Sequence, residues 1–335
     1  MLKRLLSLLC ALLLTLGAFP ALAATPKPID VIPYEDLPEP LDGQYHYLLL
    51  CEDLWADSPT RDGKPRGNTD GIVLVTLDTR ARRVMLTSFI RDALVSRPNP
   101  DKPGDGIGRI NYIAKQSGPE TLCRVISQHI GVKVDKYIIF TFKHVSDIID
   151  HLGGVTITVT AEEASYLNRY RISRTSTKPS MASAGTYLFG GHAAVIYMRI
   201  RKAGGGGDFM RTQRVRTVLS TLADQCREIT YDEARNLVNV VLQNNVVTNI
   251  NLETMVDAME HAFELRGCTV EELRIPPEGA VHPISYVGMA AQELDWDKCR
   301  VAMADYLENS FLVYTPRDDT LLDDLEDLED FDWDE

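Results

Sequence analysis

GIVLVTLDTRARRVMLTSFI, residues 71–90, is the stretch that decides the fold. Apolar residues dominate 71–77 and 83–90, and the polar residues 78–82 between them indicate a turn. This pattern predicts two buried strands that pair as a hairpin. The second strand runs directly into Arg91 and Asp92, so charged side chains are expected where a buried strand ends.

Further strands and helices alternate on both sides of this hairpin. The expected strands cover residues 45–51, 136–142 and 155–159 and a short segment at 273–275. Helices are expected at residues 112–130, 143–152, 191–198, 212–229, 231–245, 252–265 and 290–309, whereas 161–186 is polar and irregular. Such alternation predicts the α/β class: a single layered α-β-α domain with a central mixed sheet flanked by helices.

An export segment is expected to precede the domain. Residues 1–23 place Lys3 and Arg4 before an apolar run that ends in small residues, as a signal peptide or a retained signal anchor does. Residues 24–44 are proline-rich and predict a linker, and residues 45–315 form the expected domain. This order predicts an extracytoplasmic protein, either associated with the cell membrane or secreted to the cell envelope.

The net charge of −13 comes mostly from the C-terminal end. Residues 317–335 contain eleven acids and one arginine, which gives this segment a charge of −10. We therefore predict an acidic disordered tail over residues 316–335. A nucleic-acid partner is not expected, because the chain carries an export segment and no recognisable helix-turn-helix.

Six cysteines occur, of which Cys10 lies in the export segment. The other five include no CxxC spacing, so a zinc site is not expected. In an oxidising compartment a Cys268–Cys299 disulfide fits these residues, and buried free thiols fit them equally well.

Residues 197–216 read YMRIRKAGGGGDFMRTQRVR and hold five arginines. Each guanidinium presents five N–H donors in a planar fork that suits phosphate oxygens. The four glycines at 204–207 allow the arginines before and after them to fold toward one another. The stretch therefore fits an anion site, and a solvated basic helix after a glycine loop is the alternative with the same composition.

Six motifs occur in a fixed order: NTDGIVLV, SFIRD, RIN, DHLGGV, YMRIR and DFMRTQR. In letters and spacing the region from about residue 45 to 225 resembles the LytR-CpsA-Psr (LCP) family of bacterial cell-envelope proteins. The resemblance implies a phosphotransferase that moves a glycopolymer, such as teichoic acid or a capsular or secondary wall polysaccharide, from an undecaprenyl-pyrophosphate carrier to peptidoglycan. It also implies assistance by Mg²⁺ and a place at the membrane surface.

The resemblance assigns roles residue by residue. Asp53 and Asp70 match aspartates that bind the metal. The expected pyrophosphate ligands are Arg91, Arg199, Arg201, Arg211 and Arg214. Arg91 and Arg211 are also expected to act in catalysis together with Asp208, which either accepts the proton of the acceptor hydroxyl or orients Arg211.

Four positions depart from the family pattern. Asn68 replaces an arginine, Ile90 replaces a proline, Met210 replaces a glycine, and Val215 replaces a glutamine. The changes at Asn68 and Val215 keep open the alternative of a catalytically weak envelope protein that binds polyprenyl pyrophosphates. A second alternative is a pyrophosphatase that uses water as the acceptor.

The residue types also suit the implied chemistry. Breaking a pyrophosphate linkage spreads negative charge over oxygens, which arginines and a carboxylate-bound Mg²⁺ stabilise. A polyprenyl chain needs an apolar groove in addition. The helix at 112–130 and residues 137–149 carry enough Ile, Val and Phe to line one, as ordinary core residues also would.

Overall fold

The computed structural model describes most of the chain between residues 29 and 307. The described residues are 26, 29–57, 60–61, 64–97, 106–169, 183–201, 203, 207–243 and 246–307, without the side chains at 61, 64, 207, 208 and 243. The predicted export segment 1–23, the acidic tail 316–335 and Cys10 lie outside them. Within the described ranges, no helix combines the length and the apolar composition that crossing a bilayer requires.

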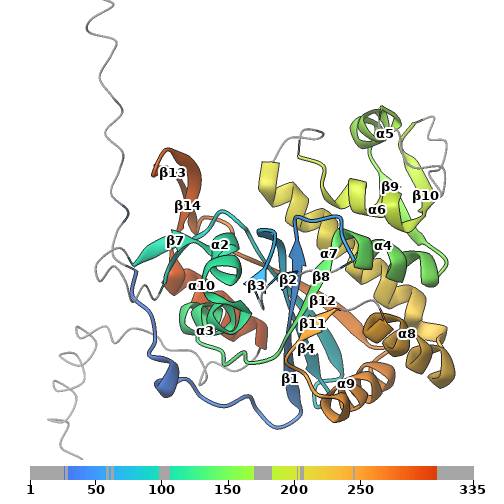
Figure 1. Ribbon diagram of the computed structural model, residues 1–335, viewed down its shortest axis with the longest axis horizontal. Coiled ribbons are helices and arrows are strands. Elements are labelled where there is room, and N and C mark those ends of the chain that lie inside the picture. The colour runs from blue at the N-terminus through green and yellow to red at the C-terminus, as the bar shows by residue number, and fades with distance from the viewer. Residues whose placement is uncertain are drawn as a thin grey trace, which may run out of the picture.

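A mixed sheet forms the centre of the domain (Figure 1). In the described chain its strands lie in the order β11 (Val247–Thr248), β8 (Tyr137–Thr141), β1 (Gln44–Glu52), β4 (Thr69–Asp78), β5 (Arg83–Phe89) and β12 (Thr269–Ile275). β4 pairs antiparallel with β5, which confirms the hairpin predicted over residues 71–90. β1 pairs antiparallel with β4 and parallel with β8, so the hairpin lies in the middle of the sheet.

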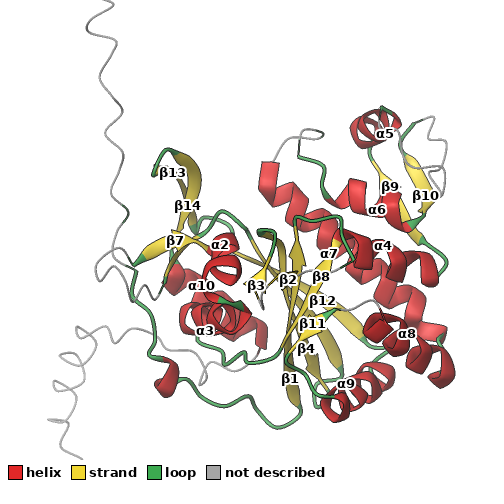
Figure 2. Ribbon diagram, in the orientation of Figure 1, coloured by secondary structure: helices red, strands yellow, loops and turns green. Residues whose placement is uncertain are grey.

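Helices cover both faces of this sheet (Figure 2). One face packs against α2 (Ile110–Ser117), α3 (Pro119–Ile130) and α10 (Trp296–Leu307). The other lies under α4 (Phe142–His151), α6 (Gly191–Met198), α7 (Gly207–Gln225), α8 (Tyr231–Gln243) and α9 (Leu252–Glu264). The predicted α-β-α layering around a central mixed sheet is confirmed.

Alternate residues along each central strand serve opposite faces of the sheet. Leu48, Leu50 and Leu74 are buried in the hydrophobic core shared with α2, α3 and α10. Leu49 and Val73 point to the opposite side, where they line a pocket beneath α4 and α7. Both faces are apolar, which is why 71–77 reads as a continuous hydrophobic run.

Smaller sheets surround the central one. The pairs are β2 (Thr60–Arg61) with β3 (Lys64–Pro65), β6 (Leu94–Ser96) with β7 (Ile107–Arg109), β9 (Val155–Val159) with β10 (Gly185–Phe189), and β13 (Val281–Tyr286) with β14 (Met289–Leu294). Short 3-10 turns occur at Tyr34–Asp36 and Cys226–Glu228. β9, β10, α5 (Ala161–Asn168) and α6 enclose a second hydrophobic core, to which α4 and α7 contribute Ile149 and Val218.

The structure corrects several predicted elements. The helix expected at 112–130 is two helices, because Gly118 adopts φ 95° and Pro119 begins the second. The strand at 155–159 pairs with β10 and does not join the central sheet, and the stretch 161–186 predicted as irregular contains α5 and the start of β10. The helix expected from residue 290 begins at Trp296, because residues 289–294 pair with β13.

The segment predicted as a linker packs on the domain over its described second part. The Ile32 N–H donates to Gln128 O of α3 at 3.1 Å, and the side chains of Ile32 and Leu37 are buried. The Arg124 guanidinium lies 4.5 Å from the centre of the Tyr34 ring. From residue 29 onward this segment therefore contributes to the folded body.

The predicted Cys268–Cys299 disulfide is wrong. Cys299 belongs to α10 and is buried in the core, whereas Cys268 packs in a separate cluster with Tyr47 and Leu265. Both thiols are free, as are those of Cys51, Cys123 and Cys226. The alternative of free thiols holds for these five residues, and the core is stabilised by apolar packing.

The first prediction concerns the contact between α6 and α4. A Cβ built on Gly191 would lie 2.0 Å from Ser146 O, and the Gly191 N–H donates to Asp150 Oδ1 at 2.7 Å. Because helix backbone atoms cannot give way cheaply, we expect Gly191→Ala to lower the free energy of unfolding by about 3 kcal/mol in a denaturant titration. Gly267→Ala, whose added Cβ meets no atom within 4 Å, is the matched control. Equal stability of the two variants would contradict this close packing.

Candidate functional site

The Asp70 carboxylate gathers three arginines from distant parts of the chain. Its Oδ2 lies 2.6 Å from Arg91 Nη1, 3.2 Å from Arg211 Nη1 and 3.4 Å from Arg201 Nη2. We call Asp70, Arg91, Arg201 and Arg211 the Asp70 cluster. The structure thus brings four of the residues predicted from sequence into direct contact.

Each member of the cluster stands at the end of a strand or helix. Asp70 is near the start of β4 and Arg91 follows the end of β5, and these ends are neighbours because the two strands run antiparallel. Arg201 follows α6, and Arg211 is the fifth residue of α7. Long side chains from these positions therefore meet at the same end of the central strands.

The cluster carries an excess of positive charge. Burial by itself would raise the pKa of Asp70, but the hydrogen bond from Arg91 and the charges of Arg211 and Arg201 outweigh burial, so the pKa is lowered. Asp70 is therefore ionised at neutral pH and offsets one of the three guanidinium charges, and Asp92 Oδ2 lies 3.6 Å from Arg91 Nε. The position of Asp70 Oδ2 shows that the three arginines can bind one negatively charged oxygen at the same time.

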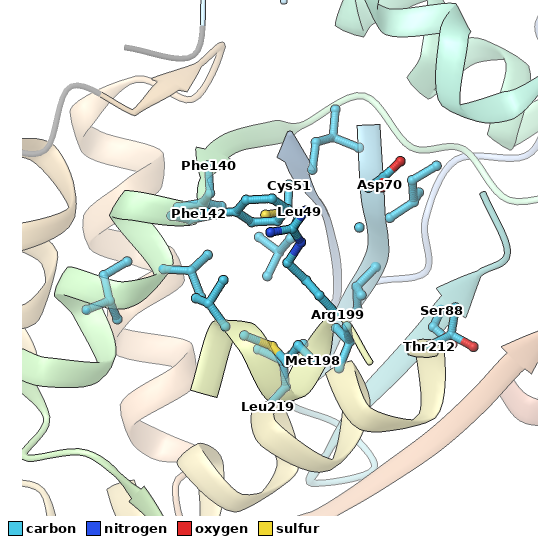
Figure 3. Close-up of a pocket in the computed structure, with 18 of the residues that line it drawn as sticks. Leu49, Cys51, Asp70, Ser88, Phe140, Phe142, Met198, Arg199, Thr212 and Leu219 are labelled. Carbon is cyan, nitrogen blue, oxygen red and sulfur yellow. The ribbon is translucent and has the colours of Figure 1, made fainter. Parts of the chain in front are cut away.

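Arg199 lies beside the cluster and does not contact Asp70. It caps the end of α6, and its guanidinium carbon lies 4.4 Å from the centre of the Phe142 ring. Figure 3 shows this side chain extending from α6 toward Phe142 and Cys51. Arg199 is exposed and has no acidic partner among the described residues, so its donors remain available to a ligand.

Arg214, the remaining predicted pyrophosphate ligand, is engaged elsewhere. Its Nε donates to Glu163 Oε1 at 2.6 Å, and its two Nη atoms donate to Ile200 O and Ala203 O at 2.8 and 2.9 Å. The side chain is 2% exposed. Arg214 is therefore committed to anchoring the segment that carries Arg201, and it does not join the Asp70 cluster.

Glu163 was missed because its surroundings read as irregular. It belongs to α5, where the Thr160 hydroxyl accepts from the Glu163 N–H and the Glu163 carboxylate accepts from the Thr160 N–H. Such a reciprocal cap has a sequence signature, Ser or Thr followed three residues later by Glu or Gln. The signal was present at Thr160 and Glu163, but its pairing with Arg214 is a tertiary contact that no local pattern encodes.

Asp53 and Asp70, the predicted metal ligands, come from adjacent strand ends. The Asp53 N–H donates to Asn68 O at 2.9 Å, and the Asp53 side chain is exposed. Asp70 Oδ1 and Asn68 Oδ1 are buried without a hydrogen-bond partner among the described residues. Unpaired oxygens of this kind fit a hard cation. In the same residues no three acidic, histidine or cysteine side chains converge, so a cation there needs further oxygens from a ligand.

Glu52 is a buried carboxyl directly before Asp53, and the sequence had indicated only Asp53 as a site residue. Its side chain is fully buried, and the Gly67 N–H donates to its Oε2 at 2.9 Å. Burial raises the pKa of Glu52 to about 7, although the backbone N–H groups of Gly67 and Arg66 act in the opposite direction. Glu52 thereby ties the end of β1 to the turn that leads into Asp70.

The side chain of Asp208 lies outside the described residues. Its backbone belongs to the first turn of α7, three residues before Arg211. Its two predicted roles, accepting a proton from the acceptor or orienting Arg211, stay predictions.

An apolar pocket of about 300 Å³ adjoins the cluster, between the sheet and α4, α6, α7 and α8. The charged residues in its lining are Asp70, Arg199 and Arg211. The walls visible in Figure 3 include Leu49, Cys51, Phe140, Phe142, Met198 and Leu219. A ligand held here would meet arginines on one part of its surface and hydrocarbon on the rest.

One stripe of α7 follows the pocket. Arg211, Val215, Leu219 and Leu222 recur every three or four residues, so they share one helical face, and all four line the pocket. At 1.5 Å per residue, the distance from Arg211 to Leu222 along the helix is about 16 Å. The pocket therefore leads from the Asp70 cluster into an apolar interior.

The predicted groove is corrected in one of its two walls. Residues of the segment 137–149 do line the pocket, among them Phe140, Val145 and Ile148. The helix expected at 112–130 does not, because α2 and α3 pack into the core on the opposite face of the sheet. The second wall comes from α7 and α8. These segments were predicted to be helices, but not to line the groove.

Comparison with known proteins places the chain. A family model described as the LytR_cpsA_psr family matches residues 36–300, most of its length. The chain belongs to the LytR_cpsA_psr family. The resemblance drawn from the six motifs is confirmed, and the matched residues include every member of the Asp70 cluster.

Relatives and solved structures agree with this assignment. Biofilm regulatory protein A of Streptococcus mutans is 26% identical over 62% of this chain and 51% of its own length. The polyisoprenyl-teichoic acid–peptidoglycan teichoic acid transferase TagT of Bacillus subtilis is 23% identical over 66% of each chain. The matches thus span about half to two thirds of these relatives.

Solved structures share the fold. Protein gbs0355 of Streptococcus agalactiae superposes with a TM-score of 0.65 at 19% identity, over 80% of this chain and 89% of its own. TagT bound to LI-WTA superposes with a TM-score of 0.59 at 19% identity, over 84% and 94%. The layered arrangement around a mixed sheet is therefore that of other LytR_cpsA_psr proteins.

The second prediction tests whether Arg214 is a structural anchor of this LytR_cpsA_psr protein. Arg214→Met leaves the Glu163 carboxylate buried without its partner, so we expect the free energy of unfolding to fall by about 3–5 kcal/mol. Arg227→Met is the matched control, because Arg227 and its partner Asp224 are about half exposed; its loss should stay within about 0.5 kcal/mol. Similar unfolding midpoints for both variants would show that Arg214 is not an anchor.

The third prediction concerns the pH dependence that Glu52 brings. An acid whose pKa rises from 4.5 to about 7 on folding holds its proton more tightly in the folded state, so stability falls as pH rises between these values. We expect the wild type to lose about 3 kcal/mol relative to Glu52→Gln from pH 4.5 to pH 7.5, measured by denaturant unfolding without divalent cations. A constant difference between the two proteins across this range would rule out the raised pKa.

Proposed function

We propose that this protein is a phosphotransferase that moves a glycopolymer from a polyprenyl-pyrophosphate carrier to peptidoglycan. One observation carries the proposal: three arginines converge on one oxygen of Asp70, and Asp70 and Arg211 line an apolar pocket. A polyprenyl pyrophosphate combines a doubly charged anion with a long hydrocarbon chain. Its two parts correspond to the Asp70 cluster and to the pocket.

The pocket supplies the affinity for the chain. Each methylene removed from water stabilises the complex by about 0.8 kcal/mol, so even a few isoprene units make a strong contribution. The lining from Val145 and Ile148 on α4 and Leu219 and Leu222 on α7 offers apolar contacts on both sides. An undecaprenyl chain is longer than the pocket can enclose, and its remainder would stay in the membrane.

The arginines supply the charge stabilisation. In the proposed step an acceptor hydroxyl attacks the phosphorus that bears the glycan, and the bond from this phosphorus to the bridging oxygen breaks. The polyprenyl monophosphate leaves, and the hydroxyl proton passes to a base, for which Asp208 is the candidate. Arg91, Arg201, Arg211 and Arg199 would hold the phosphate oxygens and neutralise the negative charge that grows on the leaving group.

A divalent cation fits the same arrangement. Asp70 and Asp53, with the unpaired Asn68 Oδ1 nearby, are the residues that would hold Mg²⁺ together with phosphate oxygens. When bound, Mg²⁺ would withdraw negative charge from the pyrophosphate. The carboxylate of Asp70 would then exchange part of its arginine contacts for the cation, and the arginines would turn to the substrate.

The cellular setting belongs to the same proposal. The export segment predicted over residues 1–23 would place the domain at the outer face of the cell membrane, within reach of peptidoglycan. The name of the TagT relative links that protein to teichoic acid and peptidoglycan, which favours a wall polymer as the cargo. A capsular or secondary wall polysaccharide has the same pyrophosphate chemistry.

One observation keeps the weakly catalytic binding protein as a second candidate. Val215 places an apolar side chain in the pocket lining directly beyond Arg211, where the family pattern has a polar glutamine. The test combines purified protein, Mg²⁺, a synthetic polyprenyl-pyrophosphate glycan and peptidoglycan fragments. A phosphodiester-linked product supports transfer, carrier monophosphate without product supports a pyrophosphatase, and tight binding without either supports the binding protein.

The fourth prediction concerns the rate of this transfer. Arg201 is 46% exposed at its side chain, so Arg201→Ala should leave the fold intact. A well-aimed arginine can contribute about 10³ to 10⁵ in phosphoryl transfer, and several share the task here, so we expect the rate to fall at least about 10²-fold. Arg227→Ala, an exposed arginine on the turn after α7, is the control. An unchanged rate for Arg201→Ala would remove this side chain from the mechanism.

A further inference from the structure

A large aromatic side chain stands exposed shortly after the end of β1. Trp55, two residues beyond Asp53, is 47% exposed, and its ring centre lies 4.6 Å from that of His192 at an interplanar angle of 42°. Trp296, the other described tryptophan, is 5% exposed and donates its indole N–H to Leu94 O. Among the described residues the indole N–H of Trp55 has no partner of this kind.

The backbone around Trp55 is held firmly. The Phe142 N–H donates to Leu54 O at 2.9 Å, and the Thr141 hydroxyl donates to Ala56 O at 2.6 Å. His144 Nε2 lies 3.0 Å from Asp57 O. The residues on both sides of Trp55 are thus fastened to the start of α4, so the indole is presented in a fixed place.

The same contacts connect this ring pair to the site. Phe142, whose N–H holds Leu54, carries the Arg199 guanidinium over its ring and lines the pocket. His192 lies at the start of α6, the helix that Arg199 ends. A ligand with its phosphates on the arginines would therefore extend toward the Trp55 ring with the group next to the phosphate.

We propose that Trp55 and His192 form a stacking platform for a sugar ring of the substrate glycan. This inference rests on the proposed function, which places a sugar directly beyond the pyrophosphate. A pyranose has an apolar C–H face that packs on an aromatic ring and hydroxyl groups at its edge that need polar partners. Asp57, two residues beyond Trp55, and Lys143 could provide such partners: their charged groups lie 3.4 Å apart, and Lys143 Nζ also donates to Asp147 Oδ2 at 2.6 Å.

A sugar accounts for these neighbours better than a lipid surface does. Asp57 and Asp147 both contact Lys143, which leaves this group of three with one net negative charge that anionic phospholipids would repel. Contact with a lipid surface would also not require the fixed backbone around Trp55 that the hydrogen bonds to the start of α4 provide. The ring that stacks here is either the first sugar of the carrier-linked polymer or a sugar of the peptidoglycan acceptor.

The fifth prediction compares two probes by calorimetry in the presence of Mg²⁺: farnesyl pyrophosphate and farnesyl pyrophosphate bearing N-acetylglucosamine. Aromatic contacts of this kind contribute about 0.5–1.5 kcal/mol, so Trp55→Ala should weaken binding of the sugar-bearing probe about 2- to 10-fold. Binding of the sugar-free probe should not change. Trp55→Phe should keep most of the affinity, and His192→Ala should lose part of it.

Tyr231→Ala is the matched control, because Tyr231 is 43% exposed and packs edge-on against Phe263, an aromatic pair on α8 and α9. Saturation-transfer NMR with a soluble peptidoglycan disaccharide distinguishes the two sugar sources. If Trp55→Ala abolishes that signal while both farnesyl probes bind as before, the platform serves the acceptor. If only the sugar-bearing probe is affected, the platform serves the donor.

Three results would overturn the inference: no effect of Trp55→Ala on any sugar, equal weakening of both farnesyl probes, or loss of binding to phosphatidylglycerol vesicles alone. Failure of the proposed function looks different, because the wild type would then bind neither farnesyl probe. In that case the disaccharide decides the inference. A signal that depends on Trp55 still supports the platform, and absence of a signal removes it.

Discussion

The convergence of Arg91, Arg201 and Arg211 on Asp70 Oδ2 is the constraint on which the site depends. Three guanidinium groups repel one another, and they stay together without a ligand because one buried carboxylate lies between them. The lowered pKa of Asp70 keeps this carboxylate charged at neutral pH. Asp70 therefore holds the arginines ready, and an oxygen anion of the substrate can take up the same donors.

Other charged groups keep the elements in place that deliver these arginines. The pair of Arg214 and Glu163 fastens α7 to α5, and Arg214 also binds the segment that carries Arg201, while Arg216 binds Glu272 on β12. Gly191 lets α6 lie directly on α4. The helices held by these contacts line the apolar pocket beside the cluster. The arginines of residues 197–216 thus serve two purposes. Arg201 and Arg211 are placed to contact a ligand, whereas Arg214 and Arg216 hold structural elements together.

Much of the sheet could be predicted from sequence, because the hydrophobic runs at β1, β4, β5 and β8 are long and end in clear turn or charge signals. β13 and β14 were missed because they bury few residues, Ala291 and Leu294 among them, and carry no apolar period. Arg211 and Arg214 share a helical face by spacing, yet one meets Asp70 and the other Glu163. That division is set by tertiary partners, as is the burial of Glu52 beside the exposed Asp53, and neither is encoded in local pattern.

A crystal structure of the protein soaked with farnesyl pyrophosphate and Mg²⁺ would test the central claim most directly. We predict phosphate oxygens within hydrogen-bond distance of Arg91, Arg201 and Arg211, and the farnesyl chain along the stripe of α7 from Val215 to Leu222. Density for the pyrophosphate on another face, with all three arginines still on Asp70 and the pocket empty, would contradict it.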